Sequence, residues 1–436
     1  MLFINLSCLC LANTDVWLTA TPNSNPWPGT PANPYYAGDA AQFTSILTTC
    51  NQNYTFHYTP GTYQTLGWKL GERQTANSGC IHLGAGIDQT VIQLVGARNR
   101  SLDGNIFSHD STKLANGFQA HHMTLDCNAA NNPQFTSGLG RCEAVVVAGN
   151  NITLDGLKVI GFGTSVAGAE CSPLIVAMWS PLKSAHPSGT TFSNILIENC
   201  IVTSPVASGN LCNVTCCAIG ADPIFSLQNA VISNCAILNV QSDFPFTQGL
   251  SAPVVENCTV NGCSTGVYYE NATAPCIVRN NSFANVVRGV HAVEDPDYRL
   301  PSLLVDGNLF NMTCSHDAWA INGYGVGNGN FGSVVVTNNT ILFPDCSDPS
   351  CGGVGFNNTD SLTVENNEIT FGSAPDNGRR LGVNASTVGL KHFFGNYDGS
   401  TQLMVYDYDT GTLWTQFEAS FSIPLGPLKN HPRSEK

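Results

Sequence analysis

The sequence predicts an all-β protein built as a solenoid, and three observations support this fold class. Only 11% of the 436 residues are charged, less than half of the usual share of roughly 25%. The polar residues are instead Asn, Thr, Ser and Gly, which disfavour helix interiors and favour strands and turns. A short string of alternating apolar and polar residues also recurs along the chain, which is the pattern of a repeat architecture.

The repeated string consists of alternating apolar residues, an acidic or polar residue, and then Asn or Gly. One copy is Leu196-Ile-Glu-Asn-Cys200 and another is Val254-Val-Glu-Asn-Cys258, while a looser copy, Met123-Thr-Leu-Asp-Cys127, begins the series. The fourth residue recurs at separations of 43, 35, 23, 23, 27, 31 and 28, at Gly156, Asn199, Asn234, Asn257, Asn280, Gly307, Asn338 and Asn366. A minimum spacing with variable excess indicates a fixed turn of chain that carries insertions.

Each repeat holds period-2 strands that are too short for a helical repeat. Stacking one repeat per coil pairs equivalent strands in parallel, about 4.8 Å apart. Asn suits the bend because it tolerates the left-handed conformation, and its amide bonds to nearby backbone or to a stacked amide. We therefore expect a right-handed parallel β-helix with an asparagine ladder, and we expect Cys200, Cys235 and Cys258 to stack just after it as core side chains.

Three further segments resemble the pectate lyase-like superfamily of right-handed β-helix proteins, which includes rhamnogalacturonase-like enzymes and phage tailspikes. Asp39-Ala-Ala-Gln-Phe-Thr-Ser-Ile-Leu47 resembles the helix that caps the N-terminal end of such proteins. Tyr58-Thr-Pro-Gly-Thr-Tyr63 and Ile81–Ile92 resemble the coils that follow. The resemblance covers roughly residues 35–375 and implies the fold, but not the activity, because this scaffold carries lyases, hydrolases, transferases, epimerases and binding proteins.

The predicted organisation has three parts. Residues 1–34 form an N-terminal extension whose apolar start is either a signal-peptide remnant or a first strand. Residues 35–389 form the β-helix. Residues 390–436 form a C-terminal cap and tail, in which Leu403–Phe417 is expected to be a β-hairpin that turns near Asp409-Thr410-Gly411. This hairpin either covers the open end of the sheets or makes a subunit contact.

The cysteine content indicates the cellular compartment of the protein, and the net charge limits the classes of molecule that it can bind. Eighteen cysteines in a β-rich chain predict a secreted, extracellular protein with disulfides, and the lack of Cys-x-x-Cys spacing predicts no bound metal cluster. The net charge of −14, with 17 Lys and Arg, argues against nucleic acid and anionic membrane surfaces as partners. No apolar run is long enough to insert into a membrane.

A β-helix has no interior pocket, so a long ligand must lie along an outer face. Val267 and Val290 each lie ten residues after a repeat Asn and are expected to point inward, which turns Tyr268 and His291 outward and stacks them. Continuing this face through the neighbouring repeats collects the outward candidates: Asp222, Tyr268, Glu270, His291, Glu294, Asp295, Asn322 and Tyr324.

Carboxylates on one face matter because glycosidic cleavage needs a proton donor and a second carboxylate that acts as nucleophile or base. We expect Glu270 and Glu294 to form this pair, with Asp222 or Asp295 as substitutes and His291 as a candidate general base. Aromatic faces and amides bind sugars, and the substrate-binding candidates are Trp179, Tyr268, Trp319, Asn322 and Tyr324. The alternative is that these carboxylates end strands and these aromatic rings pack under loops.

The range of expected activities is narrowed mostly by motifs of known enzyme families that the sequence lacks. The chain lacks the Asp-Asp, Gly-His-Gly and Arg-Ile-Lys motifs of polygalacturonase-like enzymes. Asp295-Pro-Asp-Tyr298 resembles the Asp-Pro-x-His element of uronan epimerases, but Tyr occupies the His position. A protein of charge −14 would also repel a polyuronate, so neutral glycans fit better.

The sequence therefore predicts a secreted carbohydrate-active enzyme, a glycoside hydrolase or glycan transferase that acts on an oligo- or polysaccharide without a cofactor. One alternative is a polysaccharide lyase or epimerase on an anionic glycan, and a lyase is expected to depend on calcium. The other is a non-catalytic glycan-binding, tailspike-like or adhesin solenoid. The resemblance also implies that a homotrimer is one of the expected oligomeric states.

Overall fold

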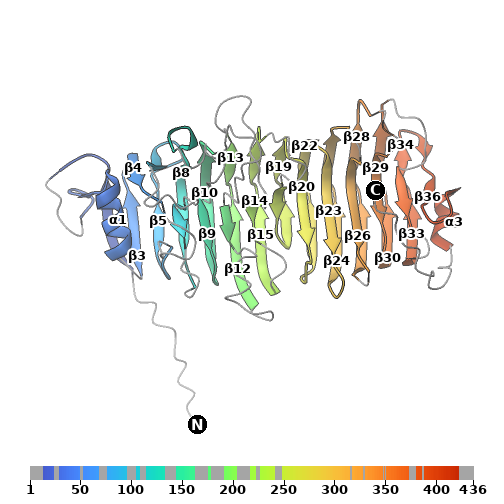
Figure 1. Cartoon of the computed structure of the whole chain (residues 1–436), viewed down its shortest axis with the longest axis horizontal. Helices are drawn as coiled ribbons and strands as arrows, with labels where there is room; N and C mark the ends of the chain where they lie inside the picture. Colours follow the sequence, from blue (N-terminus) through green and yellow to red (C-terminus); the bar gives the residue numbers. More distant parts are fainter. Residues whose placement is uncertain are drawn as a thin grey trace, which may run out of the picture.

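Three strands and the bends between them make one coil of this protein, and the coils follow one another along its long axis (Figure 1). The computed structural model describes residues 13–23, 29–49, 53–67, 76–95, 105–108, 114–132, 144–162, 175–177, 191–203, 217–221, 226–240, 248–314, 317–327, 329–346, 348, 350–372, 380–384 and 387–421. The architecture is the right-handed parallel β-helix that the sequence predicts.

The first two strands of each complete coil belong to a 25-stranded sheet. Its members are β1 (Thr14–Thr19), β2 (Tyr35–Tyr36), β3 (Tyr54–Tyr58), β4 (Gly61–Thr65), β5 (Ile81–Leu83), β6 (Thr90–Leu94), β8 (Gln119–Asp126), β10 (Ile152–Ile160), β12 (Thr191–Glu198), β13 (Ile201–Thr203), β15 (Ser226–Ser233), β16 (Ala236–Leu238), β18 (Val254–Glu256), β19 (Thr259–Asn261), β21 (Cys276–Arg279), β22 (Ser282–Val286), β24 (Arg299–Asp306), β25 (Leu309–Met312), β27 (Asn330–Thr337), β28 (Thr340–Phe343), β30 (Thr359–Glu365), β31 (Glu368–Phe371), β33 (Val388–Phe394), β34 (Tyr397–Asp398) and β35 (Thr401–Gln402).

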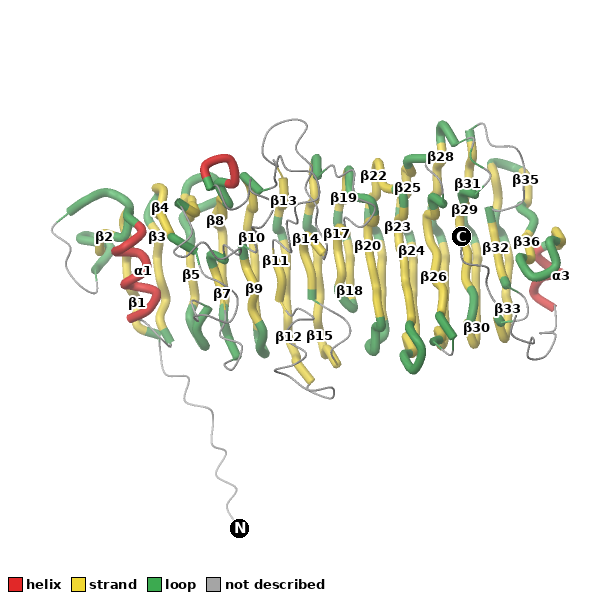
Figure 2. Tube along the Cα trace, viewed as in Figure 1, coloured by secondary structure: helices red, strands yellow, loops and turns green. Residues whose placement is uncertain are grey.

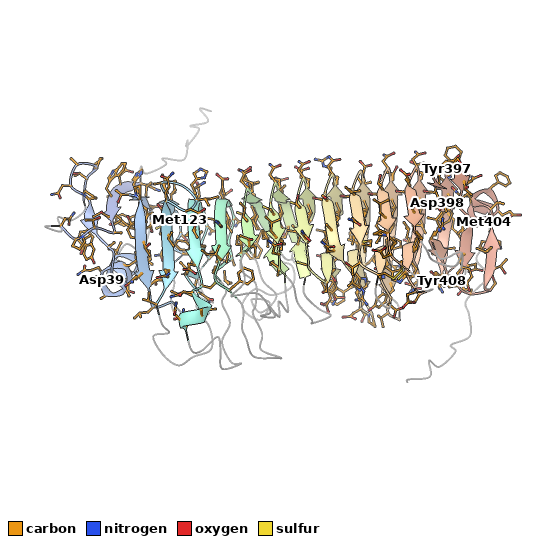
Figure 3. All side chains as sticks on the ribbon, turned by 90° about the horizontal axis from the view of Figure 1, so that it is seen from above. Asp39, Met123, Tyr397, Asp398, Met404 and Tyr408 are labelled. Atoms are coloured by element: carbon orange, nitrogen blue, oxygen red, sulfur yellow. A yellow bond between two sulfur atoms is a disulfide. The ribbon has the colours of Figure 1, made fainter. Side chains whose placement is uncertain are left out.

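The third strand of each coil belongs to a 12-stranded sheet. Its members are β7 (Phe107–Ser108), β9 (Val145–Val147), β11 (Ile175–Ala177), β14 (Cys217–Gly220), β17 (Gln248–Ser251), β20 (Thr265–Glu270), β23 (Arg288–Glu294), β26 (Trp319–Gly325), β29 (Gly352–Phe356), β32 (Leu381–Val383), β36 (Val405–Asp407) and β37 (Thr412–Trp414). Seen from above, Tyr397 of the larger sheet and Tyr408, just after β36, lie on opposite long faces (Figure 3).

Short helices lie at both ends of the solenoid (Figure 2). At the N-terminal end, α1 (Ala40–Thr49) confirms the predicted capping helix, and Asp39 Oδ1 accepts the backbone N–H of Gln42 at 2.9 Å as an N-cap. At the other end, β36 and β37 form the predicted antiparallel hairpin, which is followed by α3 (Gln416–Phe421). A single 3₁₀ turn, η1, spans Ala129–Asn131. None of the helices that the structure describes is long and apolar enough to cross a membrane.

The solenoid extends beyond both predicted boundaries. β1 pairs in parallel with β3, so the first coil begins at Thr14 and not at residue 35. At the far end, β33 and β34 continue the parallel sheet past residue 389. Residues 1–12, which were expected to be either a signal-peptide remnant or a first strand, lie outside the described residues.

The bend between the first two strands carries the repeat residue that the sequence singles out. All eight predicted positions have positive φ values, for example 54° at Asn199 and 66° at Gly307. This conformation costs most L-residues about 1–2 kcal/mol but is tolerated by Asn and Gly, so the composition of the repeat follows from its geometry. The loose copy is out of register, because His121 pairs with Asp155 and therefore puts His122, not Asp126, at the bend.

The amide ladder lies one residue after the bend, and not at the bend itself as predicted. Asn308 is buried; it donates to Asn339 Oδ1 at 3.0 Å and accepts from Asn281 Nδ2 at 2.9 Å. This column continues toward the N-terminal end of the solenoid as the three stacked cysteines, and it comprises Cys200, Cys235, Cys258, Asn281, Asn308, Asn339, Asn367 and Asn396. Gln416 of α3 closes it by accepting from Asn396 Nδ2 at 3.0 Å.

Candidate functional site

The candidate site lies on the outer face of the 12-stranded sheet, between β20 and β36. The parallel register aligns Val267, Val290 and Ile321 in one row, and all three side chains are fully buried in the core. The next row therefore points outward and contains Tyr268, His291 and Asn322. The predicted inward and outward rows are both confirmed at these positions.

Aromatic and amide groups make close contacts along the outward row. The ring centroid of His291 lies 5.7 Å from that of Tyr268 and 5.6 Å from that of Tyr324. His291 Nδ1 lies 2.9 Å from Asn322 Oδ1. Because the amide oxygen can only accept, Nδ1 carries the hydrogen and the lone pair is on Nε2.

His291 is covered by its neighbours even though it faces outward from the sheet. Only 3% of its surface is exposed. Burial, together with the positive charge of Arg288, lowers the pKa of His291 to about 4. The imidazole is therefore neutral at neutral pH, as a general base has to be.

Glu270 lies two residues after Tyr268 on β20, and its carboxylate is exposed. The hydroxyl of Tyr268 donates to Glu270 Oε2 at 3.4 Å. Burial, and next the negative charge of Glu270, raise the pKa of Tyr268 well above its usual range. Tyr268 thus remains a phenol, which contacts the Glu270 carboxylate through its hydroxyl and the His291 imidazole through its ring.

Glu294 does not lie on this face, contrary to the prediction. It follows Val290 by four residues, so the period-2 alternation turns its side chain inward, and its exposed surface is 0%. Glu294 Oε1 accepts the backbone N–H of Ala272 at 3.1 Å, while Oε2 has no hydrogen-bond partner among the described residues. Burial raises the pKa of Glu294 to about 8, so this carboxyl holds its proton at neutral pH.

Asp295, one residue further on, lies at the end of β23 and is partly exposed. Asn271 fixes it from the previous coil. The Asn271 amide donates to Asp295 Oδ2 at 2.9 Å, and Asn271 Oδ1 accepts the Asp295 backbone N–H at 2.8 Å. Among the described residues, Glu270 and Asp295 are therefore the predicted carboxylates that are open to solvent, at the C-terminal ends of β20 and β23.

Trp319 and Tyr324 border a hollow of about 230 Å³ on the same face. Trp319 lies over two glycines, since a Cβ at Gly352 or Gly355 would come within 2.2 or 2.6 Å of its ring. Tyr408 lies over Gly382 in the same way, and its ring centroid is 6.2 Å from that of Trp319. Glycines in the sheet thus let large rings lie flat on its surface.

Sequence reasoning missed three residues that bring polar side-chain groups to this hollow: Asn357, Asn384 and Tyr408. Tyr408 lies in the C-terminal hairpin, which was expected to cap the end or to make a subunit contact. The signal for its role was present in the sequence as the glycines at 352, 355 and 382, whose missing side chains leave room for rings. Two predicted residues, Asp222 and Trp179, lie outside the described residues.

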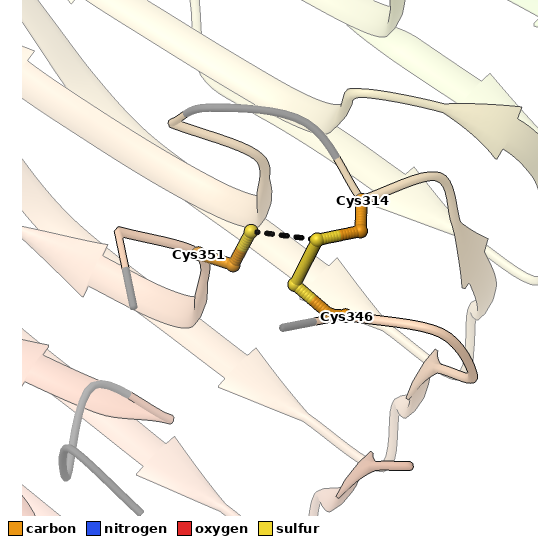
Figure 4. A group of neighbouring side chains, drawn as sticks. All are labelled: Cys314, Cys346 and Cys351. Carbon is orange, nitrogen blue, oxygen red and sulfur yellow. Dashed lines mark hydrogen bonds between the residues drawn. A yellow bond between two sulfur atoms is a disulfide. The ribbon is translucent and has the colours of Figure 1, made fainter. Parts of the chain in front are cut away.

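The face holds no group of three metal-ligating side chains among the described residues. Two such groups lie elsewhere. In one, Cys314 and Cys346 form a disulfide with Cys351 Sγ 3.5 Å from Cys314 Sγ (Figure 4), and Cys127 is disulfide-bonded as well. The other group is His121, His122 and Asp155. A calcium requirement, expected only for a lyase, remains a prediction.

Comparison with known proteins identifies the fold. No protein-family model and no curated protein matches the sequence. The tailspike of E. coli bacteriophage HK620 matches with a TM-score of 0.50 and 13% identity, over 87% of this chain and 64% of the tailspike. The same tailspike in complex with a pentasaccharide matches with a TM-score of 0.49 and 12% identity, over 87% of this chain and 64% of the tailspike.

The A-module of the Azotobacter vinelandii mannuronan C-5 epimerase AlgE4 matches with a TM-score of 0.40 and 12% identity, over 87% of this chain and 94% of the module. This chain spans less than two thirds of the tailspike, about 64% of its length. The chain is thus a right-handed parallel β-helix protein, as its resemblance to the pectate lyase-like superfamily implied.

Proposed function

We propose that this protein is carbohydrate-active and binds an oligo- or polysaccharide along the outer face of the 12-stranded sheet. The observation that carries the proposal is the hollow in which Trp319, Tyr324 and Tyr408 lie beside the amides of Asn322, Asn357 and Asn384. Sugar rings present apolar faces and a rim of hydroxyls. Flat aromatic side chains take up the apolar faces, and amides both donate to and accept from hydroxyls.

A glycan with little charge suits this face best. The protein carries a net charge of −14, and a polyanion would be repelled without a local basic strip. The groups that border the hollow are aromatic rings, amides and glycines. Recognition would therefore depend on shape and hydrogen bonds.

Glu270 is the group that we assign to proton transfer. It is exposed and accepts the Tyr268 hydroxyl, and the ring of that tyrosine lies 5.7 Å from the neutral ring of His291. Glycoside cleavage needs a second carboxyl group, and Asp295 is our choice because Glu294 is buried and protonated at neutral pH. The Cys314–Cys346 disulfide supports the further proposal that the protein works outside the cell.

The test has a binding arm and a turnover arm. Purified protein is applied to an array of neutral and acidic glycans, and the captured glycans are then incubated with it and assayed for new reducing ends and for ultraviolet-absorbing unsaturated products. We expect Trp319→Ala to abolish capture, and Glu270→Gln to keep capture but lose turnover. Glu368→Gln, an exposed glutamate on the other sheet, is the matched control.

A non-catalytic glycan-binding solenoid is the second candidate, and one observation favours it. The expected partner of Glu270 is turned into the core, since Glu294 has no exposed surface. Capture of a glycan that is never turned over would support this second candidate. Equal capture by wild type and Trp319→Ala would contradict both candidates, while unsaturated products would assign a lyase.

A further inference from the structure

Two adjacent histidines and an aspartate lie together on the 25-stranded sheet, which is not the sheet of the glycan site. His121 of β8 is the parallel register partner of Asp155 of β10. His121 Nδ1 lies 3.4 Å and His122 Nε2 lies 3.6 Å from the same oxygen, Asp155 Oδ2. The three ligand atoms all lie within 4.8 Å of one another.

The backbone at His122 brings both imidazoles to one side. Successive residues of a regular strand point to opposite faces, but His122 has a φ of 54°, in the left-handed region. The eight repeat positions in the following coils carry Asn or Gly at this bend. A histidine in a conformation that favours Asn and Gly is an outlier of the kind found at functional sites.

Glycine in the next coil makes room for the second ring. Gly156 follows the register partner of His121, and a Cβ there would lie 2.5 Å from His122 Nδ1. The ring therefore lies against the Gly156 backbone with Nε2 directed at Asp155. An asparagine at this position, as in most later coils, would displace the imidazole.

Neighbouring amides orient the other two ligands. Asn199 Nδ2 donates to Asp155 Oδ1 at 2.8 Å, which leaves Oδ2 for the histidines. His121 Nε2 lies 3.1 Å from Gln119 Oε1, so this nitrogen carries the hydrogen. When the hydrogen of the neutral His121 ring is on Nε2, the lone pair of Nδ1 points at Asp155 Oδ2. A cation between these two atoms makes the arrangement favourable. Amides that fix the far side of a ligand are typical of metal sites.

We propose that His121, His122 and Asp155 bind Zn²⁺ or a divalent ion of similar preference, such as Co²⁺. Tetrahedral zinc with bonds of about 2.0–2.1 Å places its ligands about 3.4 Å apart, which the separations of 3.4 and 3.6 Å match. The two nitrogen ligands argue against calcium, which takes oxygen ligands. The side chain of His122 is 58% exposed, which gives an ion access and leaves the fourth position to solvent.

The test is titration of the full chain, stripped with a chelator, with ZnCl₂ in a calorimeter and with CoCl₂ followed by visible absorption. We expect one high-affinity ion per chain and the intense visible bands of tetrahedral cobalt. His122→Asn removes the ligand but keeps a residue suited to the bend, so the fold is retained. It should weaken zinc binding by about 100-fold or more, and Gln119→Ala by about 10- to 100-fold.

His392→Asn is the matched control, because His392 Nε2 and Glu365 Oε2, 3.7 Å apart on the same sheet, have no third ligand among the described residues. This variant should bind zinc as the wild type does. The proposal is overturned if the wild type takes up neither ion, or if His122→Asn and wild type bind zinc with equal affinity. Unfolding curves of each variant without metal verify that the fold is intact.

Discussion

Glu270 and Glu294 belong to neighbouring strands of one sheet, yet their side chains lie on opposite sides of its backbone. Glu270 pairs in register with Val293, so Glu294 is one residue out of step with it. One carboxylate therefore faces solvent, and the other is fully buried with one oxygen unpartnered among the described residues. The first is open to a ligand, while the second is expected to act on stability.

The first prediction concerns the pH dependence of stability. Folding raises the pKa of Glu294 from 4.5 to about 8, so the folded state holds a proton that the unfolded state loses between these values. The free energy of unfolding should therefore fall as pH rises through this window, by at most about 1.4 kcal/mol per pH unit. Glu294→Gln should remove this slope, measured as the urea midpoint between pH 6.5 and 9.

An infrared spectrum provides the control for this prediction. The C=O stretch of a protonated carboxylic acid should be present in the wild type at pH 7, vanish above pH 9 and be missing in Glu294→Gln. Glu368→Gln, which alters an exposed glutamate, should leave the band and the slope unchanged. A wild type whose stability is level between pH 6.5 and 9 would contradict the assignment.

The second prediction concerns His291, whose effect on the free energy of unfolding changes with pH in the opposite direction. Folding lowers its pKa from 6.5 to about 4, so the unfolded state binds the proton first. Stability from the neutral imidazole is complete above pH 6.5 and is lost as pH falls toward 4. In the wild type Glu294 opposes this loss above pH 4.5, so the His291 effect should emerge fully in Glu294→Gln.

The imidazole can also be followed directly. Asn322 accepts the Nδ1 hydrogen, an interaction that raises the pKa of His291. Asn322→Ala should therefore lower this pKa further, as measured by NMR titration of the ring carbons. Asn338→Ala, a change on the other sheet, should leave it unaltered. A titration of His291 near 6.5 in the wild type would show that the ring is not buried.

The third prediction concerns the amide ladder. Asn308 donates to the carbonyls of Val278 and Asp306 and to Asn339, and it accepts two hydrogen bonds from Asn281. Asn308→Ala would leave buried hydrogen-bond donors and acceptors in both neighbouring coils without partners. We expect a loss of at least about 3 kcal/mol, measured by urea unfolding.

The matched control for the ladder is the bend residue of the next coil, Asn338. It is exposed and has a φ of 56°, a conformation that glycine also adopts. Asn338→Gly should therefore cost less than about 1 kcal/mol. Equal losses in the two variants would mean that the buried column contributes no more than the bend.

Most of the fold was predictable because each coil repeats one local rule. Asn199 and Asn338 mark the bend because their backbone is left-handed there. The position of the buried ladder was missed because the residue after the bend is Cys in earlier coils and Asn in later ones, for example Cys258 and Asn281. Only the stacked geometry shows that these residues share one column.

The site was harder to predict, for two physical reasons. The alternation that places Val290 inside also places Glu294 inside, but this glutamate was grouped with the outward carboxylates, and the alternation was not followed to the end of the strand. Tyr408 reaches the hollow from a hairpin nearly ninety residues after Trp319, and no local pattern encodes that approach. His122 was missed because the repeat string was aligned four residues late.

The fourth prediction concerns the glycines beneath the aromatic rings. A Cβ at Gly355 would lie 2.6 Å from the ring of Trp319, so Gly355→Ala should lift the ring and reshape the hollow without touching any group assigned to catalysis. Glycan capture should weaken by about tenfold, measured by surface binding. Ser333→Ala, on the other sheet, is the control. Unchanged glycan capture would mean that binding does not depend on the position of the Trp319 ring over Gly355.

The ladder also makes the length of the protein adjustable in whole coils. Each coil offers the next one the same bonds, so removal of residues 235–257, one 23-residue spacing from Asn234 to Asn257, would join Asn234 to Cys258 and bring Cys200 onto Cys258. Removal of one residue fewer would turn the side chains of the strand after the junction to the opposite face. Gln416 supplies the final amide of the ladder from a helix, so within the described residues the repeat of identical bonds ends at α3.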